Sequence, residues 1–285
     1  MPNSVDERAR SDYDRARRKA FLNRALAALS GQPTTLLSYD EVKEKLHVGG
    51  PVYRGLQTIP VGQIAGSLNR YHQFDRAFLP TQDVNSSRWQ KISQAFYQDV
   101  DLPPVVLYKV GQVYFVVDGH HRVSVAREQG QEFIEAEVRE CATRVNITPN
   151  LTPEDLEILH DKVHFLERTR LDDLRPESRI RLTIPDGFDR ILEHIAVHKY
   201  FMGLDLRRDI SDEEAVTHWY DEVYQPIIAV IRSSGVLEYF PGKTEGDLYL
   251  WVLDHQRFLS EAQGQSLQPP TSAARRYVKK KKKGE

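Results

Sequence analysis

The residues whose types could do chemistry together stand in one run: Asp118, Gly119, His120, His121 and Arg122. Arginine can place two parallel hydrogen bonds on a phosphate, and glycine lets the backbone approach a ligand closely. Histidine can donate to phosphate oxygens, and its charge responds to pH near neutrality. The aspartate could cap a helix, hold a histidine tautomer or take a metal ion that bridges phosphates. The run therefore suggests an anion site.

The neighbouring segments indicate how this run is positioned. Residues 113–117 are all apolar, which predicts a strand covered on both faces. A helix is predicted over 120–129 with Gly130 as its stop, followed by a half-buried strand over 133–139. A helix that begins directly after a strand presents free amides and a positive dipole end. Three adjacent basic side chains at such an end are explained by a bound anion, whereas the alternative is an ordinary Asp-Gly turn with solvent-exposed side chains.

Upstream segments supply further parts of the same domain. A helix is predicted over 86–98, and two β-rich runs over 103–117 are joined by a tight turn at Gly111. A strand is predicted over 58–66. In the polar loop that follows it, Arg70 is a candidate second phosphate clamp, although the loop also fits a purely structural role.

The run 113–138, "VYFVVDGHHRVSVAREQG...FIEAEV", resembles the core of the ParB/sulfiredoxin-like superfamily. ParB proteins carry Gly-Glu-Arg-Arg there and bind CTP, sulfiredoxins carry Gly-Cys-His-Arg and use ATP, and the free serine kinases carry Asp-Gly-His-Thr-Arg and use ADP. The chain is most similar to the last motif, with His121 in place of threonine. The resemblance, which extends with less specificity over about 55–140, implies that the Asp118–Arg122 turn holds nucleotide phosphates.

The sequence also departs from each of these families in residues or segments that the family's activity needs. Sulfiredoxin chemistry needs a thiolate where this chain has His120, and Cys141 lies at the end of the next predicted strand. Chromosome-partitioning ParB proteins need a helix-turn-helix, which residues 150–264 do not suggest. The serine kinases need a carboxylate base, for which Asp75 and Asp83 are candidates by position alone.

The fold class expected is α+β, a ParB/sulfiredoxin-like mixed domain followed by an all-helical domain. The predicted division is an N-terminal helix and linker over 1–47, the nucleotide-binding domain over 48–145, the helical domain over 150–264 and a disordered basic tail over 265–285. The helical half also resembles uncharacterised bacterial proteins with a ParB-like N-terminal domain, in "AVTHWYDEVYQPI" and "FPGKTEGDLYLW".

Helix signals recur outside the central motif. The segment 12–30 predicts a docking helix whose apolar face includes Phe21, Leu22 and Leu26. In the helical half, Thr152 and Ser211 are predicted to cap helices. A helix is also predicted over 185–203. Pro226 is predicted to break or kink a helix.

Two other features of the helical half can each be explained by a structural or by a functional role. The pairs His160/His164 and His194/His198 have a spacing that can bind zinc, but partly buried histidines are the preferred interpretation. Aromatic residues such as Trp219 predict an aromatic core, with a dimer face as the alternative.

The composition of the chain indicates the cellular compartment in which it is expected. The net charge is −2, and from Arg275 onward the chain carries two arginines, five lysines and one glutamate, so the remainder is acidic. The single cysteine fits a reducing compartment, and the apolar runs are too short to span a membrane. A cytoplasmic protein is expected, without a signal peptide.

The sequence thus predicts a nucleotide-binding regulator that takes ATP, ADP or CTP, with Mg²⁺ as a possible companion ion and a homodimer as a possible state. The alternatives are a small-molecule kinase or NTPase using the same pocket, or a DNA-binding transcriptional regulator without nucleotide. Any contact with DNA is assigned to the basic tail, whose attraction to nucleic acid would depend on salt.

Overall fold

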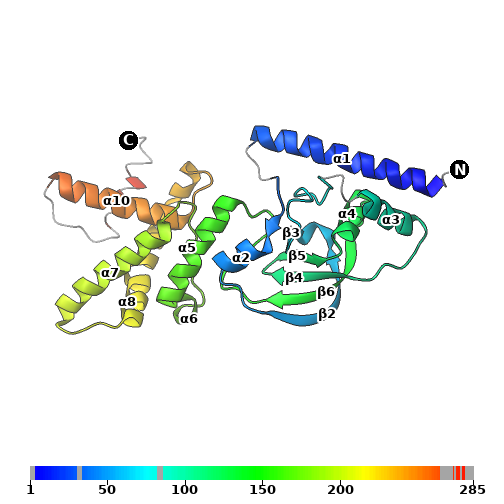
Figure 1. Ribbon diagram of the computed structural model, residues 1–285. Coiled ribbons are helices and arrows are strands. Elements are labelled where there is room, and N and C mark those ends of the chain that lie inside the picture. Colours follow the sequence, from blue (N-terminus) through cyan, green and yellow to red (C-terminus); the bar gives the residue numbers. More distant parts are fainter. Residues whose placement is uncertain are drawn as a thin grey trace. The chain divides into compact units, whose positions relative to one another are not determined.

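The computed structural model describes residues 4–30, 34–81, 86–263, 272, 274–276 and 278–279 (Figure 1). The chain divides into two compact units, residues 1–156 and 157–285. The first holds a mixed α/β sheet and the second is largely helical, as predicted for the fold class. Most of the basic tail, including Lys280 to Lys283, lies outside the described residues.

In the described part of unit 1, six strands form one mixed sheet in the order β1-β3-β5-β4-β6-β2. The strands are β1 (Leu37–Ser38), β2 (Pro51–Pro60), β3 (Ile64–Ser67), β4 (Val105–Val110), β5 (Val113–Asp118) and β6 (Phe133–Cys141). β3 and β4 flank β5, parallel and antiparallel to it respectively. The predicted strand over 58–66 is instead the end of β2, a 3₁₀ turn (Val61–Gln63) and β3.

β5 is the buried centre of this sheet, as its apolar sequence predicts. Its Tyr114 and Val116 belong to a core cluster with Val123 of α4 (His120–Glu128). On the opposite face, Phe115 lies edge-on to Tyr39 of α2 (Tyr39–Lys45), with ring centroids 5.6 Å apart. Side chains on both faces are thus covered, which accounts for the loss of alternation in the sequence.

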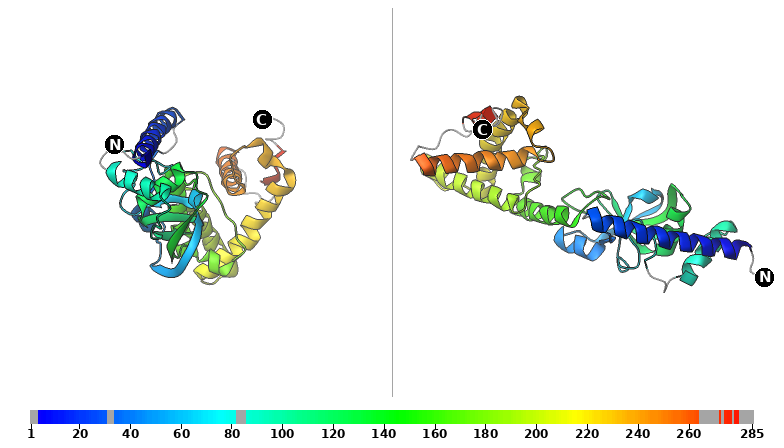
Figure 2. Two further views of the ribbon diagram at one scale, coloured as in Figure 1. Left: turned by 90° about the vertical axis from the view of Figure 1, so that its right-hand side faces the viewer. Right: turned by 90° about the horizontal axis from the view of Figure 1, so that it is seen from above.

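α1 (Ser4–Ser30) and α3 (Ser86–Tyr97) lie beside α4, and Figures 1 and 2 show α1 as one long helix. α1 packs through its first half, where Tyr13 meets the buried Trp89 of α3 edge-on at 5.5 Å between ring centroids. The prediction that Phe21, Leu22 and Leu26 form the docking face is wrong, because more than half of each side chain is exposed. The helix begins eight residues earlier than predicted, and the small side chains of the buried Ala9, Ala16 and Ala20 allow close packing.

The described helices of unit 2 are α5 (Pro153–Thr169), which begins in unit 1, α6 (Leu171–Leu174), α7 (Gly187–Leu206), α8 (Asp212–Trp219), a π turn (Tyr220–Tyr224), α9 (Gln225–Ser234), a 3₁₀ turn (Val236–Tyr239) and α10 (Glu245–Gln263). Thr152 and Ser211 cap α5 and α8 as predicted, since the amides of Asp155 and Glu214 donate to their hydroxyls. Pro226 lies in the first turn of α9, directly after the π turn, where the regular α-helical hydrogen-bond pattern is interrupted.

The aromatic residues of the helical half form its core. Trp219 is 1 % exposed and donates its indole N–H to the hydroxyl of Tyr249, at 3.0 Å. Tyr220 and Tyr224 stack nearby and are also buried. Core packing, the preferred interpretation of these aromatics, is therefore confirmed. Among the described helices, none has both the length and the apolar character needed to cross a membrane.

Candidate functional site

The turn between β5 and α4 places a helix N-terminus at the edge of the buried sheet. Gly119 is the N-cap residue of the nine-residue α4, has φ +96° and contributes no side-chain cap to the first turn. A β-carbon at this position would lie 2.6 Å from Val105 Cγ1. Both the backbone conformation and the close packing therefore require glycine. The first-turn amides are left for a ligand or for water.

His120 is held in a network with the end of β3. Its Nε2 atom lies 2.8 Å from Ser67 Oγ, which in turn accepts the backbone N–H of Arg70 at 3.0 Å. Because that hydroxyl already accepts one bond, its proton is free to be donated to a neutral imidazole. Burial, together with the charge of Arg70, lowers the pKa of His120 to about 4. His120 is therefore neutral at physiological pH.

His121 is buried without any hydrogen bond. It is 5 % exposed, and neither ring nitrogen has a hydrogen-bond partner among the described residues. Its ring meets Phe74 edge-on, with centroids 5.5 Å apart. Burial, followed by the charges of Arg88 and Arg70, lowers the pKa of His121 to about 4. A buried polar side chain without a partner is costly, so a ligand or an ordered water that supplies the missing bond would explain it.

A cavity of about 100 Å³ brings these groups together. Its lining includes the predicted site residues Arg70, Asp118, Gly119, His120, His121 and Arg122, together with Arg88, Ile92 and Val117. Arg70 comes from the loop after β3 and Arg88 from the first turn of α3. The structure therefore gathers residues from three segments around the helix N-terminus. We call this the anion cavity.

Arg122 is engaged by its own chain. Its guanidinium donates to the carbonyl oxygens of Pro103 and Pro104 and forms an ion pair with Asp118 at 2.5 Å. The Arg122 side chain is only 12 % exposed, whereas that of Asp118 is 63 % exposed. Arg122 thus fixes the 103–104 segment against the motif. Among the roles expected for Asp118, capping is not observed, because its carboxylate pairs with Arg122.

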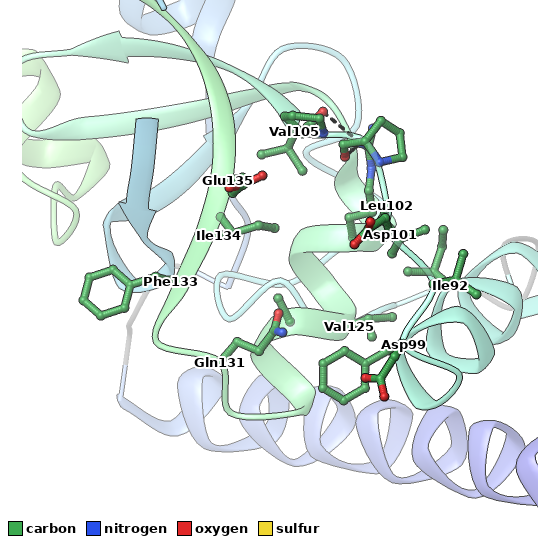
Figure 3. A pocket seen from close by; sticks show the side chains of 16 residues that line it. Ile92, Asp99, Asp101, Leu102, Val105, Val125, Gln131, Phe133, Ile134 and Glu135 are labelled. Atoms are coloured by element: carbon green, nitrogen blue, oxygen red, sulfur yellow. Dashed lines mark hydrogen bonds between the residues drawn. The ribbon is translucent and has the colours of Figure 1, made fainter. Parts of the chain in front are cut away.

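A second, larger cavity of about 440 Å³ shares Arg122 and Ile92 with the anion cavity. Figure 3 shows it between α3, the 99–104 loop, α4 and the start of β6. Apolar side chains such as Phe96 and Ile134 make up most of its lining, and carboxylates are contributed by Asp99, Asp101 and Glu135. We call this the side cavity. Its volume lies within the range typical of small-molecule sites.

Three contributors to the anion cavity and its support were not identified from the sequence: Arg88, Ser67 and Phe74. Arg88 stands in the predicted helix 86–98, where its exposed position beside the buried Trp89 gave no sign of a tertiary role. Asp75, a candidate base, instead accepts the amides of Ala77 and Leu79 and so anchors its own loop. Asp83 lies outside the described residues.

The described residues were predicted to include two histidine pairs whose spacing can bind zinc. They contain no cluster of three or more histidine, cysteine, aspartate or glutamate side chains that could hold a metal ion. His198, a member of one predicted pair, instead lies with its Nε2 3.0 Å from Nδ1 of His218. Mg²⁺ is commonly held by one carboxylate together with ligand phosphates, and Asp118 is the side chain in the anion cavity that could serve in this way.

The comparisons with known proteins concern the helical half. Residues 171–281 match the family described as Domain of unknown function (DUF4032). No curated protein matches the chain. The molecule therefore combines an N-terminal mixed α/β sheet unit with a helical region similar to this family.

Proposed function

We propose that this chain is a nucleotide-binding protein of ParB/sulfiredoxin-like type, with the phosphates held in the anion cavity and binding serving a regulatory role. The observation that carries the proposal is the pair of ring nitrogens of the buried His121, which have no partner among the described residues, in a cavity that is also lined by Arg70, Arg88 and Arg122. An anionic oxygen at this position would receive donors from the imidazolium form of His121, from Arg70 and Arg88, and from the amides of α4.

The charges around the cavity support an anion rather than a cation. Burial lowers the pKa of His121 most, and the positive charges of Arg88 and Arg70, which line the same cavity, lower it further. Asp118 is a negative group in its lining, but its charge is paired with Arg122. A bound phosphate would offset the remaining positive potential and raise the pKa of His121.

The two cavities suggest how a whole nucleotide is accommodated. The anion cavity, at about 100 Å³, suits a phosphate group rather than a complete nucleotide. The side cavity, at about 440 Å³, is large enough for a nucleoside, and both apolar and polar side chains line it. Arg122 lines both cavities, so one ligand can pass beside it with phosphates on one side and nucleoside on the other.

The ion pair of Asp118 favours a regulatory role over phosphoryl transfer. Because its carboxylate is paired with Arg122, Asp118 is not poised to accept a proton. A small-molecule kinase or NTPase is the second candidate. Its support is that the same carboxylate keeps 63 % of its side chain exposed beside the anion cavity, where an acceptor or a magnesium ion could reach it.

The test is isothermal calorimetry with ATP, ADP, CTP and GTP, with and without Mg²⁺. We expect one of these nucleotides to bind, and Arg70→Ala and Arg88→Ala each to raise its Kd roughly 10- to 100-fold, since a hydrogen bond to a charged group contributes about 1.5–3 kcal/mol. Arg139→Ala, an exposed arginine on β6, is the matched control and should leave the Kd unchanged. Failure of all four nucleotides to bind would refute the proposal. A Kd that changes in neither Arg70→Ala nor Arg88→Ala would refute it as well.

Turnover separates the two candidates. Release of inorganic phosphate, or transfer of phosphate to a small alcohol, should be negligible for a regulatory binder and should depend on Asp118 in an enzyme. The measurement is a phosphate-release assay on the wild type and on Asp118→Asn. Turnover that is lost in this variant while binding persists would assign the second function.

A further inference from the structure

The second half of α7 carries an apolar stripe that nothing else in the described part of unit 2 covers. Val197, Tyr200, Phe201 and Leu204 are each more than half exposed. Their spacing of three and four residues places them on one side of the helix, within an arc of about 100°. Exposed apolar groups arranged contiguously in this way mark interaction surfaces more often than scattered ones do. We call these four residues the α7 stripe.

The opposite side of α7 is already packed, so the stripe is a second face of the helix. Ile191 and Ile195 are buried in unit 2. The Nε2 atom of His198 lies 3.0 Å from Nδ1 of His218 on α8, and Lys199 forms an ion pair with Asp212 of α8 at 2.7 Å. A helix that is apolar on both sides requires a second partner to remove the exposed face from water.

We propose that the α7 stripe joins two copies of this chain, with their α7 helices antiparallel about a two-fold axis between Tyr200 and Phe201. In this register Tyr200 of one copy faces Phe201 of the other, and Val197 faces Leu204. Every apolar residue of the stripe then meets another apolar residue. A two-fold contact requires such a self-complementary pattern, because each surface must match itself.

The charges at the ends of the stripe select the antiparallel arrangement. Glu193 precedes the stripe and Arg207 follows it; both are exposed, and neither side chain forms an ion pair or hydrogen bond within the described part of the chain. Measured along α7 from the two-fold axis, Glu193 and Arg207 lie at distances that differ by only about 1.5 Å, which is the rise of one residue. The antiparallel pair therefore brings Glu193 of each copy to Arg207 of the other. A parallel pair would instead place like charges together.

Analytical ultracentrifugation of the full chain over a range of concentrations tests whether the α7 stripe joins two copies. A single helix pair is a small interface, so the dimer should dissociate on dilution. Phe201→Glu should yield a monomer at concentrations where the wild type is dimeric. Tyr239→Glu, the same change at an exposed aromatic residue of the 3₁₀ turn Val236–Tyr239, is the matched control and should leave the dimer intact. A monomeric wild type, or a dimer that survives Phe201→Glu with its fold intact by circular dichroism, would overturn the proposal.

Charge reversal tests both the partner and the register. Glu193→Arg and Arg207→Glu should each weaken dimerisation on the order of tenfold, because each introduces two like-charge contacts per dimer. An equimolar mixture of the two single variants should recover the wild-type affinity as a heterodimer, since both contacts are then of opposite sign. If the mixture associates no better than the separate variants, the antiparallel two-copy arrangement is wrong.

Discussion

The two adjacent histidines of the anion cavity should respond to the same substitution with opposite changes in stability. Both are buried, and both have their pKa lowered to about 4. They differ in one respect: His120 lies 2.8 Å from a hydroxyl partner on Ser67, whereas both ring nitrogens of His121 are unpartnered among the described residues. Leucine is close to histidine in size and removes the polar atoms, so His120→Leu and His121→Leu isolate the effect of the hydrogen bond.

The magnitude follows from the cost of an unpaired buried polar group, which is about 1–3 kcal/mol. His121→Leu removes that cost and should stabilise unit 1 by about this amount. His120→Leu removes one partner of a made bond and leaves the hydroxyl proton of Ser67 without an acceptor, so it should destabilise by about 1–3 kcal/mol. For a unit of this size, each kcal/mol shifts Tm by roughly 2–4 °C.

The assay is differential scanning calorimetry of the full-length variants, with hydrogen exchange of β5 and α4 amides to report on unit 1 specifically. Tm should rise in His121→Leu and fall in His120→Leu. Nucleotide affinity should fall in His121→Leu despite the added stability, because the buried polar group is retained for its ligand. A lower Tm in both variants would refute the reasoning, since it would mean that the imidazole of His121 stabilises the fold without a ligand.

Three further changes test the surrounding structure. Gly119→Ala should destabilise unit 1 by about 2–4 kcal/mol in a denaturant titration, because it combines a positive φ with a clash at Val105; a change below 1 kcal/mol would contradict the described turn. Ser124→Ala should cost about 1–3 kcal/mol, because it removes the acceptor 2.9 Å from the buried indole N–H of Trp89; an unchanged unfolding midpoint would contradict this. The lowered pKa values of the two cavity histidines mean that the unfolded chain binds more protons between pH 6.5 and 4. Stability without ligand should therefore be level above pH 6.5 and should fall by roughly 3 kcal/mol per histidine at most as pH drops to 4; Tm measured across this range checks the sign, and a rise on acidification would contradict it.

Local features of the chain were predictable where short-range rules decide them. The strand 113–118, the turn at Gly119 and the helix 120–128 follow from an apolar run, a glycine and helical spacing. The caps at Thr152 and Ser211 follow from hydroxyl side chains before acidic first turns. The fold class followed from the order of these elements, because a strand, a crossover helix and further strands are typical of a mixed sheet unit.

The environment of each site residue depended on the tertiary structure. The sequence identifies Arg122 as a basic residue in the first turn of a helix, but only the folded chain commits its guanidinium to Asp118 and to the carbonyl groups of Pro103 and Pro104. Conversely, Arg88 gave no local signal, because its place in the cavity depends on the packing of α3 beside α4.

The sequence by itself determined where an anion site could form, since backbone amides, glycine and a helix start are arranged by neighbours within a few residues. The tertiary structure decided which side chains complete that site and which histidine is left without a partner. It also decided that α1 docks through Tyr13 and small alanines rather than through Phe21 and Leu22. The physical reason is that burial and pairing depend on segments distant in the sequence, and periodicity identifies an apolar face without identifying what covers it.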